Sequence, residues 1–140
     1  MSYATQADLV DRFGELELSQ RTDRVNGTNI DAVVLGRALA DADAEIDAYL
    51  ATRYCLPLAS VPAVLTRLAA DMARYQLCAD KVPDPVRLRY EDAVKLLRQI
   101  ASGGVQLTGA VLVAAEGGSG NAVAMRTPER MFGADRLASY

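Results

Sequence analysis

The chain has 140 residues, of which 51% are hydrophobic and 24% are charged, values typical of one folded domain with a sizeable core. Its net charge of -3 and the absence of a basic run argue against a protein that binds nucleic acid through the phosphate backbone. The sequence contains no histidine, which is the commonest general base and the commonest transition-metal ligand. We therefore expect a protein that is not an enzyme and that has no cofactor or metal ion.

The N-terminal residues lack a basic segment followed by an apolar one, and no apolar stretch approaches the roughly 20 residues of a membrane span. We therefore expect a cytoplasmic protein that does not contact membranes. Cys55 and Cys78 are the only cysteines, and neither belongs to a CxxC pair. We interpret both as reduced residues that serve in packing.

A first helix is predicted close to the N-terminus. Thr5 is followed three residues later by Asp8, which is a variant of the capping box, and apolar residues come next. We expect this helix to end at Gly14. The pattern weakens between Glu15 and Asn29. Residues 23–29 include Asn26-Gly27, a pair typical of turns with positive φ, so we expect a loop over residues 23–29.

Three further segments have apolar residues at steps of three and four, which predicts helices with one buried face each. The second predicted helix begins after Asn29 and runs to about Tyr54. A connector with two prolines follows, and the third helix begins at Pro62. The fourth helix has Asp84 as its N-cap and is stopped by Gly103. The short connection between the last two helices predicts that they are antiparallel neighbours.

The predicted fold is therefore mainly α: an antiparallel bundle of about four helices in residues 1–103, followed by a C-terminal extension, residues 104–140. Larger apolar residues alternate with smaller ones at the start of this extension, at Val105, Leu107, Val111 and Val113. This alternation and the glycine-rich residues 117–121 predict a short β-hairpin. A hairpin of this size is marginal in water, so it needs a surface on which to pack.

Four carboxylates occupy alternate positions of the second predicted helix, at Asp41, Asp43, Glu45 and Asp47. Alternate positions of a helix spread over its opposite flanks and do not converge on one point. A solvent-exposed face is therefore favoured over a site for acid–base chemistry.

Arg67, Asp71 and Arg74 lie four and three residues apart on the third predicted helix, so both arginines can reach the carboxylate. In one interpretation they form an exposed salt bridge within the helix, which contributes little stability. In the other, they form a charged network across a subunit interface, where the loss of one partner would be costly. Both interpretations remain open from the sequence alone.

With the helices placed, the chain resembles a family of proteins encoded among the head and neck genes of Mu-like phages and prophages. The segments that carry the resemblance extend almost from end to end: Tyr3-Ala4-Thr5-Gln6-Ala7-Asp8-Leu9, Arg12-Phe13-Gly14, Leu39-Ala40-Asp41-Ala42-Asp43, Ile46-Asp47-Ala48-Tyr49-Leu50, Arg53-Tyr54, Leu56-Pro57-Leu58, Val61-Pro62, Leu68-Ala69-Ala70-Asp71-Met72-Ala73-Arg74-Tyr75 and Arg89-Tyr90-Glu91-Asp92-Ala93. Each segment is degenerate alone, but their order and spacing are specific.

By more distant resemblance, small helical proteins of this kind look like the head-tail connector subunits of tailed phages. This resemblance implies a structural virion protein that forms a homo-oligomeric ring in the neck, with the portal on one side and tail-side neck proteins on the other. It also implies a location in the bacterial cytoplasm during assembly and in the virion neck afterwards. The alternative is a non-enzymatic adaptor or assembly factor from the same gene cluster.

The extension is the predicted contact between subunits, because it has more apolar residues than a short segment can bury by itself. The residues that would make this contact are Val105, Leu107, Val111, Val113, Met131, Phe132, Leu137 and Tyr140. Strand addition at the free edge of a hairpin would satisfy its unpaired backbone groups on a neighbouring chain. The alternative is that the extension folds back on its own helices.

Overall fold

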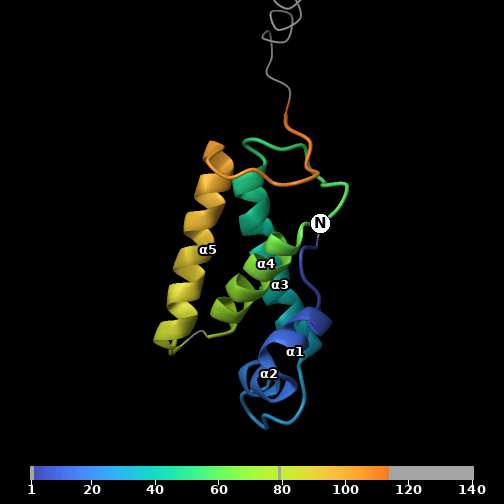
Figure 1. The fold of residues 1–140 in the computed structure, drawn as a ribbon. Coiled ribbons are helices and arrows are strands. Elements are labelled where there is room, and N and C mark those ends of the chain that lie inside the picture. Colours follow the sequence, from blue (N-terminus) through green and yellow to red (C-terminus); the bar gives the residue numbers. More distant parts are fainter. Residues whose placement is uncertain (1, 79, 114–140) are drawn as a thin grey trace, which may run out of the picture.

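The computed structural model of this chain describes residues 2–78 and 80–113. Within that part the fold is helical (Figure 1), which confirms the predicted class, and five helices replace the four expected. The helices are α1 (Gln6–Phe13), α2 (Glu15–Thr22), α3 (Ala32–Leu50), α4 (Ala63–Leu77) and α5 (Asp84–Ser102). None of the helices described is long and apolar enough to cross a membrane.

The capping box at the start of α1 is confirmed: the Thr5 side chain accepts a hydrogen bond from the Asp8 N–H, and the Asp8 carboxylate accepts one from the Thr5 N–H. Gly14 ends the helix with φ +89°, a conformation that L side chains rarely adopt. α2 begins at the next residue, so the chain turns between two short helices at this glycine.

The sequence pattern did not predict α2, which residues 15–22 form directly after Gly14. The loop expected over residues 23–29 follows this helix, as predicted. The apolar pattern of this helix is weak since two of its three buried residues, Ser19 and Thr22, are polar. Their hydroxyl groups donate hydrogen bonds to the carbonyls of Glu15 and Leu18, one turn earlier. Because both hydroxyl groups have hydrogen-bond partners within the helix, α2 can bury this polar face. A search for apolar periodicity does not detect such a face.

The three longer helices lie close to their predicted positions. Asp31 caps α3 by accepting hydrogen bonds from the N–H groups of Val33 and Val34 in the first turn. This helix ends at Leu50, earlier than the predicted Tyr54, and a turn follows. α5 begins at Asp84 itself, with Pro83 as the N-cap, and stops at Gly103 in the left-handed conformation as expected.

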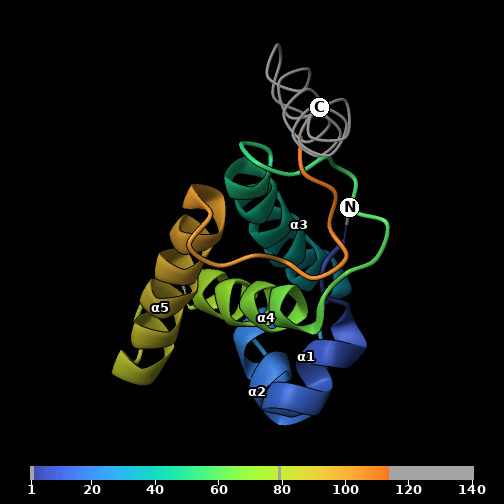
Figure 2. The ribbon, with the colours of Figure 1, turned by 45° about the horizontal axis from the view of Figure 1, so that its top comes forward.

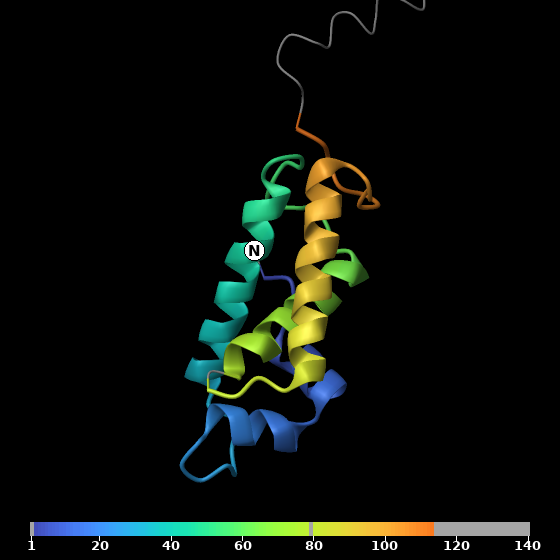
Figure 3. The same cartoon turned by 90° about the vertical axis from the view of Figure 1, so that its left-hand side faces the viewer.

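The bundle is built around α4, which packs against both α3 and α5. Figures 1 and 3 show that α3 and α5 stand side by side and run in the same sense, while α4 crosses between them obliquely and returns the chain. Successive long helices therefore reverse direction, but the bundle is not a simple set of antiparallel rods. α1 and α2 lie at one end, against α4 and α3 respectively.

Small residues let the central helices approach closely. Ala38 and Ala42 of α3 and Ala69, Ala70 and Ala73 of α4 are all buried. The distance between packed helices depends on the side chains at their contact, so alanines allow a close crossing. Larger residues fill the space around that crossing, with exposed fractions near zero: Leu9, Leu18, Leu35, Ile46, Leu50, Leu65, Leu68, Met72, Leu97 and Ile100.

The carboxylates of α3 do not all form a solvated face, which corrects the prediction. The backbone N–H of Tyr3 donates to Asp43 over 3.0 Å, and its hydroxyl donates to Asp47. The hydroxyl of Tyr90 on α5 donates to Glu45 over 2.8 Å. These carboxylates thus hold the N-terminal segment and α5 to α3, and only Asp41 of the four is exposed.

The residues after Gly103 cross the end of the bundle and return to the connector between α3 and α4 (Figure 2). Leu107 is buried there, and its N–H donates a hydrogen bond to the Tyr54 hydroxyl over 3.0 Å. Tyr54 and Leu112 form an isolated antiparallel bridge, in which the Cys55 N–H donates to the Val111 carbonyl and the Val113 N–H to the Arg53 carbonyl. Up to residue 113, the extension therefore folds back on its own chain.

The predicted β-hairpin finds no support in residues 104–113, where the structure has this single bridge and no strand. The bridge pairs Leu112 with the connector, so the segment's hydrogen bonds go to a distant part of the chain instead of to the residues that follow. The predicted turn and second strand lie outside the described residues.

Candidate functional site

Three helices converge on one charged cleft of about 470 Å³. α1 contributes Arg12 and Phe13, α4 contributes Arg67 and Asp71, and α5 contributes Arg89 and Asp92. Sequence-distant segments come together here because α1 and α5 both pack on α4. We call this set of six residues the arginine cleft.

Asp71 is the buried carboxylate of the arginine cleft, with 5% of its side chain exposed. Its Oδ2 lies 4.0 Å from Arg67 Nη1, and its Oδ1 lies 3.7 Å from Arg89 Nη1. Both separations are too long for hydrogen bonds. Asp71 thus pairs loosely with two arginines from different helices, which leaves most of their hydrogen-bonding capacity unused.

Burial raises the pKa of the Asp71 carboxyl group, because desolvation disfavours the charged form. The positive charges of Arg89, Arg67, Arg12 and Arg74 act in the opposite direction, but they do not reverse the shift. The charged form of Asp71 is therefore less stable in the folded chain than in water.

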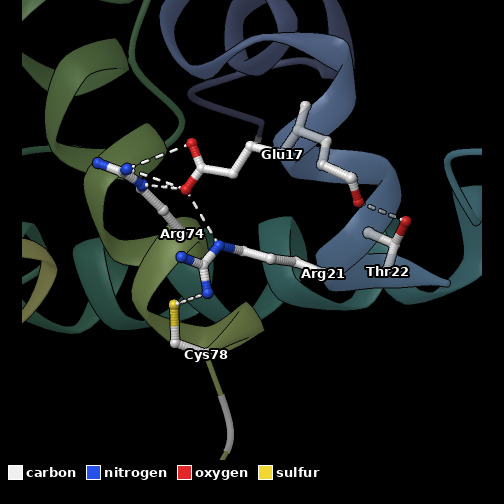
Figure 4. Close-up of polar contacts among 6 residues, drawn as sticks. Glu17, Arg21, Thr22, Arg74 and Cys78 are labelled. Carbon is white, nitrogen blue, oxygen red and sulfur yellow. Dashed lines mark hydrogen bonds and ion pairs between the residues drawn. The ribbon is translucent and has the colours of Figure 1, made fainter. Parts of the chain in front are cut away.

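Arg74 does not pair with Asp71, and the sequence prediction was wrong on this point. Arg74 forms a fork on Glu17 of α2, with Nε 3.0 Å from Oε1 and Nη2 3.2 Å from Oε2. Figure 4 shows both arginines on this carboxylate, since Arg21 Nε also donates to Glu17 Oε1 over 3.0 Å. The guanidinium of Arg74 lies over the ring of Phe13, 4.5 Å from its centroid. The spacing along α4 would allow Arg74 to pair with Asp71. Arg74 instead pairs with Glu17 of α2, which accepts two hydrogen bonds from it.

The two cysteines have different surroundings, and both are free thiols. Cys78 is buried at the end of α4, where Arg21 Nη1 donates to its Sγ over 2.8 Å. Burial raises the pKa of this thiol, because desolvation outweighs the nearby arginines. The packing interpretation is thus confirmed for Cys78 and wrong for Cys55, which is exposed.

The apolar residues predicted to contact other subunits fall into two groups. Leu107 is buried against its own chain, whereas Val105 is 37% exposed, Val111 63% and Val113 50%. Met131, Phe132, Leu137 and Tyr140 lie outside the described residues. The structure thus places Val111 and Val113, but not Leu107, on an accessible surface.

Sequence reasoning did not find Arg12 and Arg89, which complete the arginine cleft. Both lie in polar helix faces, and only the packing of α1 and α5 on α4 brings them near Asp71. One signal in the sequence was Asp71 beside the small residues of α4. A charged residue on a closely packed helix needs partners, so arginines from neighbouring helices could have been expected near it.

Comparison with known proteins identifies the family. A family model described as Bacteriophage Mu, Gp36 matches residues 3–125. This chain belongs to the Mu Gp36 family. The Mu-like prophage FluMu protein gp36 of Haemophilus influenzae is 38% identical over 105 residues, covering 75% of this chain and 74% of the relative. Gene product J of Escherichia phage Mu is also 38% identical over 105 residues, covering 74% of this chain and 74% of the relative.

These matches confirm the resemblance to Mu-like phage proteins. The arginine cleft is lined by residues between 12 and 92, so it lies within the stretch that the Mu Gp36 model matches.

Proposed function

We propose that this protein is a structural subunit of the phage neck, a head-tail connector that forms a homo-oligomeric ring between the portal and the tail-side neck proteins. The proposal rests on membership of a Mu-like phage family and on one feature of the fold. That feature is the extended segment 111–113, which lies on the surface with three large apolar side chains exposed.

The backbone of this segment favours pairing with another chain. Its hydrogen bonds to Arg53 and Cys55 use the Val113 N–H and the Val111 carbonyl. In this antiparallel geometry the N–H of Leu112 points to the opposite edge, and it has no acceptor among the described residues. A free edge flanked by apolar side chains is a template for strand addition.

A ring needs a contact in which one surface of each copy fits a different surface of the next. Strand addition at Leu112 meets this need, because the edge of one copy would pair with a separate segment of its neighbour. The exposed side chains of Val111, Leu112 and Val113 would then be buried together, which favours association through the hydrophobic effect.

The test is a nonsense mutation in the gene for this protein within its phage or prophage, with particles examined by electron microscopy. If the protein is a connector subunit, the mutant should produce filled heads and complete tails that stay separate. Addition of the purified protein should then join them. Mass spectrometry of purified wild-type virions should detect the protein. Its absence from virions would instead favour an assembly factor, and normal joining without it would exclude both roles.

A further inference from the structure

We propose that the arginine cleft binds an acidic side chain from a second copy of this chain, so that Arg12, Arg67 and Arg89 form part of the copy-to-copy contact. This inference rests on the proposed function and names one part of the ring contact. The evidence is the unused hydrogen-bonding capacity, charge and burial of the residues that line the cleft.

The three arginines hold donors that the rest of the described chain does not use. Each guanidinium has five N–H donors. None of the three side chains donates a hydrogen bond to any residue in 2–78 or 80–113, and their ion pairs are limited to the two long contacts with Asp71. The side chains of Arg67 and Arg89 are 52% and 62% exposed, so a ligand can reach them.

Asp71 acts as a positioning residue for these arginines. Because it is buried between α4 and α5, it draws Arg67 and Arg89 toward the same cleft from two different helices. One carboxylate cannot use the donors of both guanidinium groups. A second carboxylate could enter the cleft and accept two parallel hydrogen bonds from an arginine, the geometry for which guanidinium is suited.

The charge of the arginine cleft also favours an anion. Its three arginines face two carboxylates, Asp71 and Asp92, which leaves an excess of one positive charge. The whole chain has a net charge of -3, so the remainder of the molecule is more acidic than the total. Complementary charges on different faces of one chain favour head-to-tail contacts between copies.

A carboxylate of another copy fits these observations better than a nucleic-acid phosphate does. A polyanion would be repelled by a chain whose charge outside the cleft is net negative, whereas a neighbouring copy brings its own acidic groups as the partner. Asp41 on α3 is one suitable group: it is exposed, lies outside the cleft and forms no ion pair with a described residue. The occupant is therefore expected to be a protein carboxylate.

The test is sedimentation velocity of the full chain over a range of protein and salt concentrations. The wild-type chain should self-associate, and salt should weaken the association. Arg67→Glu/Arg89→Glu should raise the dissociation constant at least about tenfold while leaving the helical circular dichroism unchanged. Lys95→Glu/Arg98→Glu is the matched control, because both residues are exposed on α5, lie outside the cleft and change the net charge equally. If the glutamate variant misfolds, Arg67→Gln/Arg89→Gln replaces it.

Three results would overturn the inference. The first is a wild-type chain that stays monomeric up to its solubility limit, and the second is a cleft variant that associates like the wild type. The third is a cleft variant that loses binding of a short labelled DNA duplex but keeps its self-association, which would make the cleft a phosphate site. None of these results decides the neck role, since the head and tail joining experiment tests that role separately.

Discussion

Arg74 of α4 holds Glu17 of α2 through both oxygens of the carboxylate. The two residues are 57 positions apart, and about one-fifth of the Arg74 side chain and one-quarter of the Glu17 side chain are exposed. α2 has only eight residues, too short to be stable alone. Its position therefore depends on contacts such as this pair, which ties it to the central helix of the bundle.

Replacing Arg74 with lysine should destabilise the fold. Lysine keeps the positive charge but cannot form the fork on Glu17 or lie flat on the Phe13 ring, and we expect a loss of about 1–2 kcal/mol. Urea unfolding followed by circular dichroism measures the change. Arg87→Lys is the control, because Arg87 pairs, within the described part of the chain, only with exposed carboxylates of its own helix. The stability of this variant should match that of the wild type. Equal stability of the two variants would contradict a structural role for the Glu17 pair.

Gly103→Ala should destabilise the end of α5. The φ angle of Gly103 is +91°, and a Cβ atom there would lie 2.5 Å from Arg53 Nη1. The arginine can shift, but the backbone strain remains, so we expect a loss of about 1 kcal/mol or more. Gly36→Ala is the opposite case: Gly36 lies inside α3, and no atom beyond the helix's own backbone lies within 4 Å of the added Cβ, so alanine should add up to about 1 kcal/mol. Thermal melts that move the same way for both variants would contradict this account.

The stability contributed by Asp71 should fall as pH rises. Its pKa is higher in the folded chain than the ordinary value of 3.8, so the folded state holds the proton more tightly. The contribution is complete below pH 3.8 and is lost as pH rises through the raised pKa. Asp71→Asn should therefore be more stable than the wild type at pH 7, with the difference shrinking in acid. Urea unfolding across this pH range tests the prediction, and a variant that is less stable at pH 7 would show that the ion pairs outweigh burial.

Truncation should place the end of the stable body after Val113, not after Gly103. Chains that end at Val113 keep Leu107 in the core and the Tyr54 hydroxyl bonded to its N–H. Chains that end at Gly103 lose that buried leucine, for which we expect a cost of about 2–3 kcal/mol. Comparing the cooperativity and midpoint of thermal unfolding for the two truncations measures this difference. Identical melts would mean that residues 104–113 add nothing to the body.

Local signals in the sequence determined most of the helices. The Thr5 and Asp8 capping box, the prolines before α4 and α5, and Gly103 after α5 act through neighbouring backbone atoms, so they are readable without the fold. The apolar periods of α3, α4 and α5 also predicted which faces would be buried. α2 escaped this reasoning because Ser19 and Thr22 are buried with their hydroxyl groups satisfied by the helix itself.

Which charged residues meet depends on how the helices pack in three dimensions. Helical spacing offered Arg67 and Arg74 as the partners of Asp71. The pair with Arg67 forms, but the crossing of the helices gave Arg74 to Glu17 and brought Arg89 to Asp71. The same holds for Asp43, Glu45 and Asp47, which meet Tyr3 and Tyr90 from distant parts of the chain. Spacing along one helix limits which residues can be neighbours, whereas the energy of a charged pair depends on distance and desolvation in three dimensions.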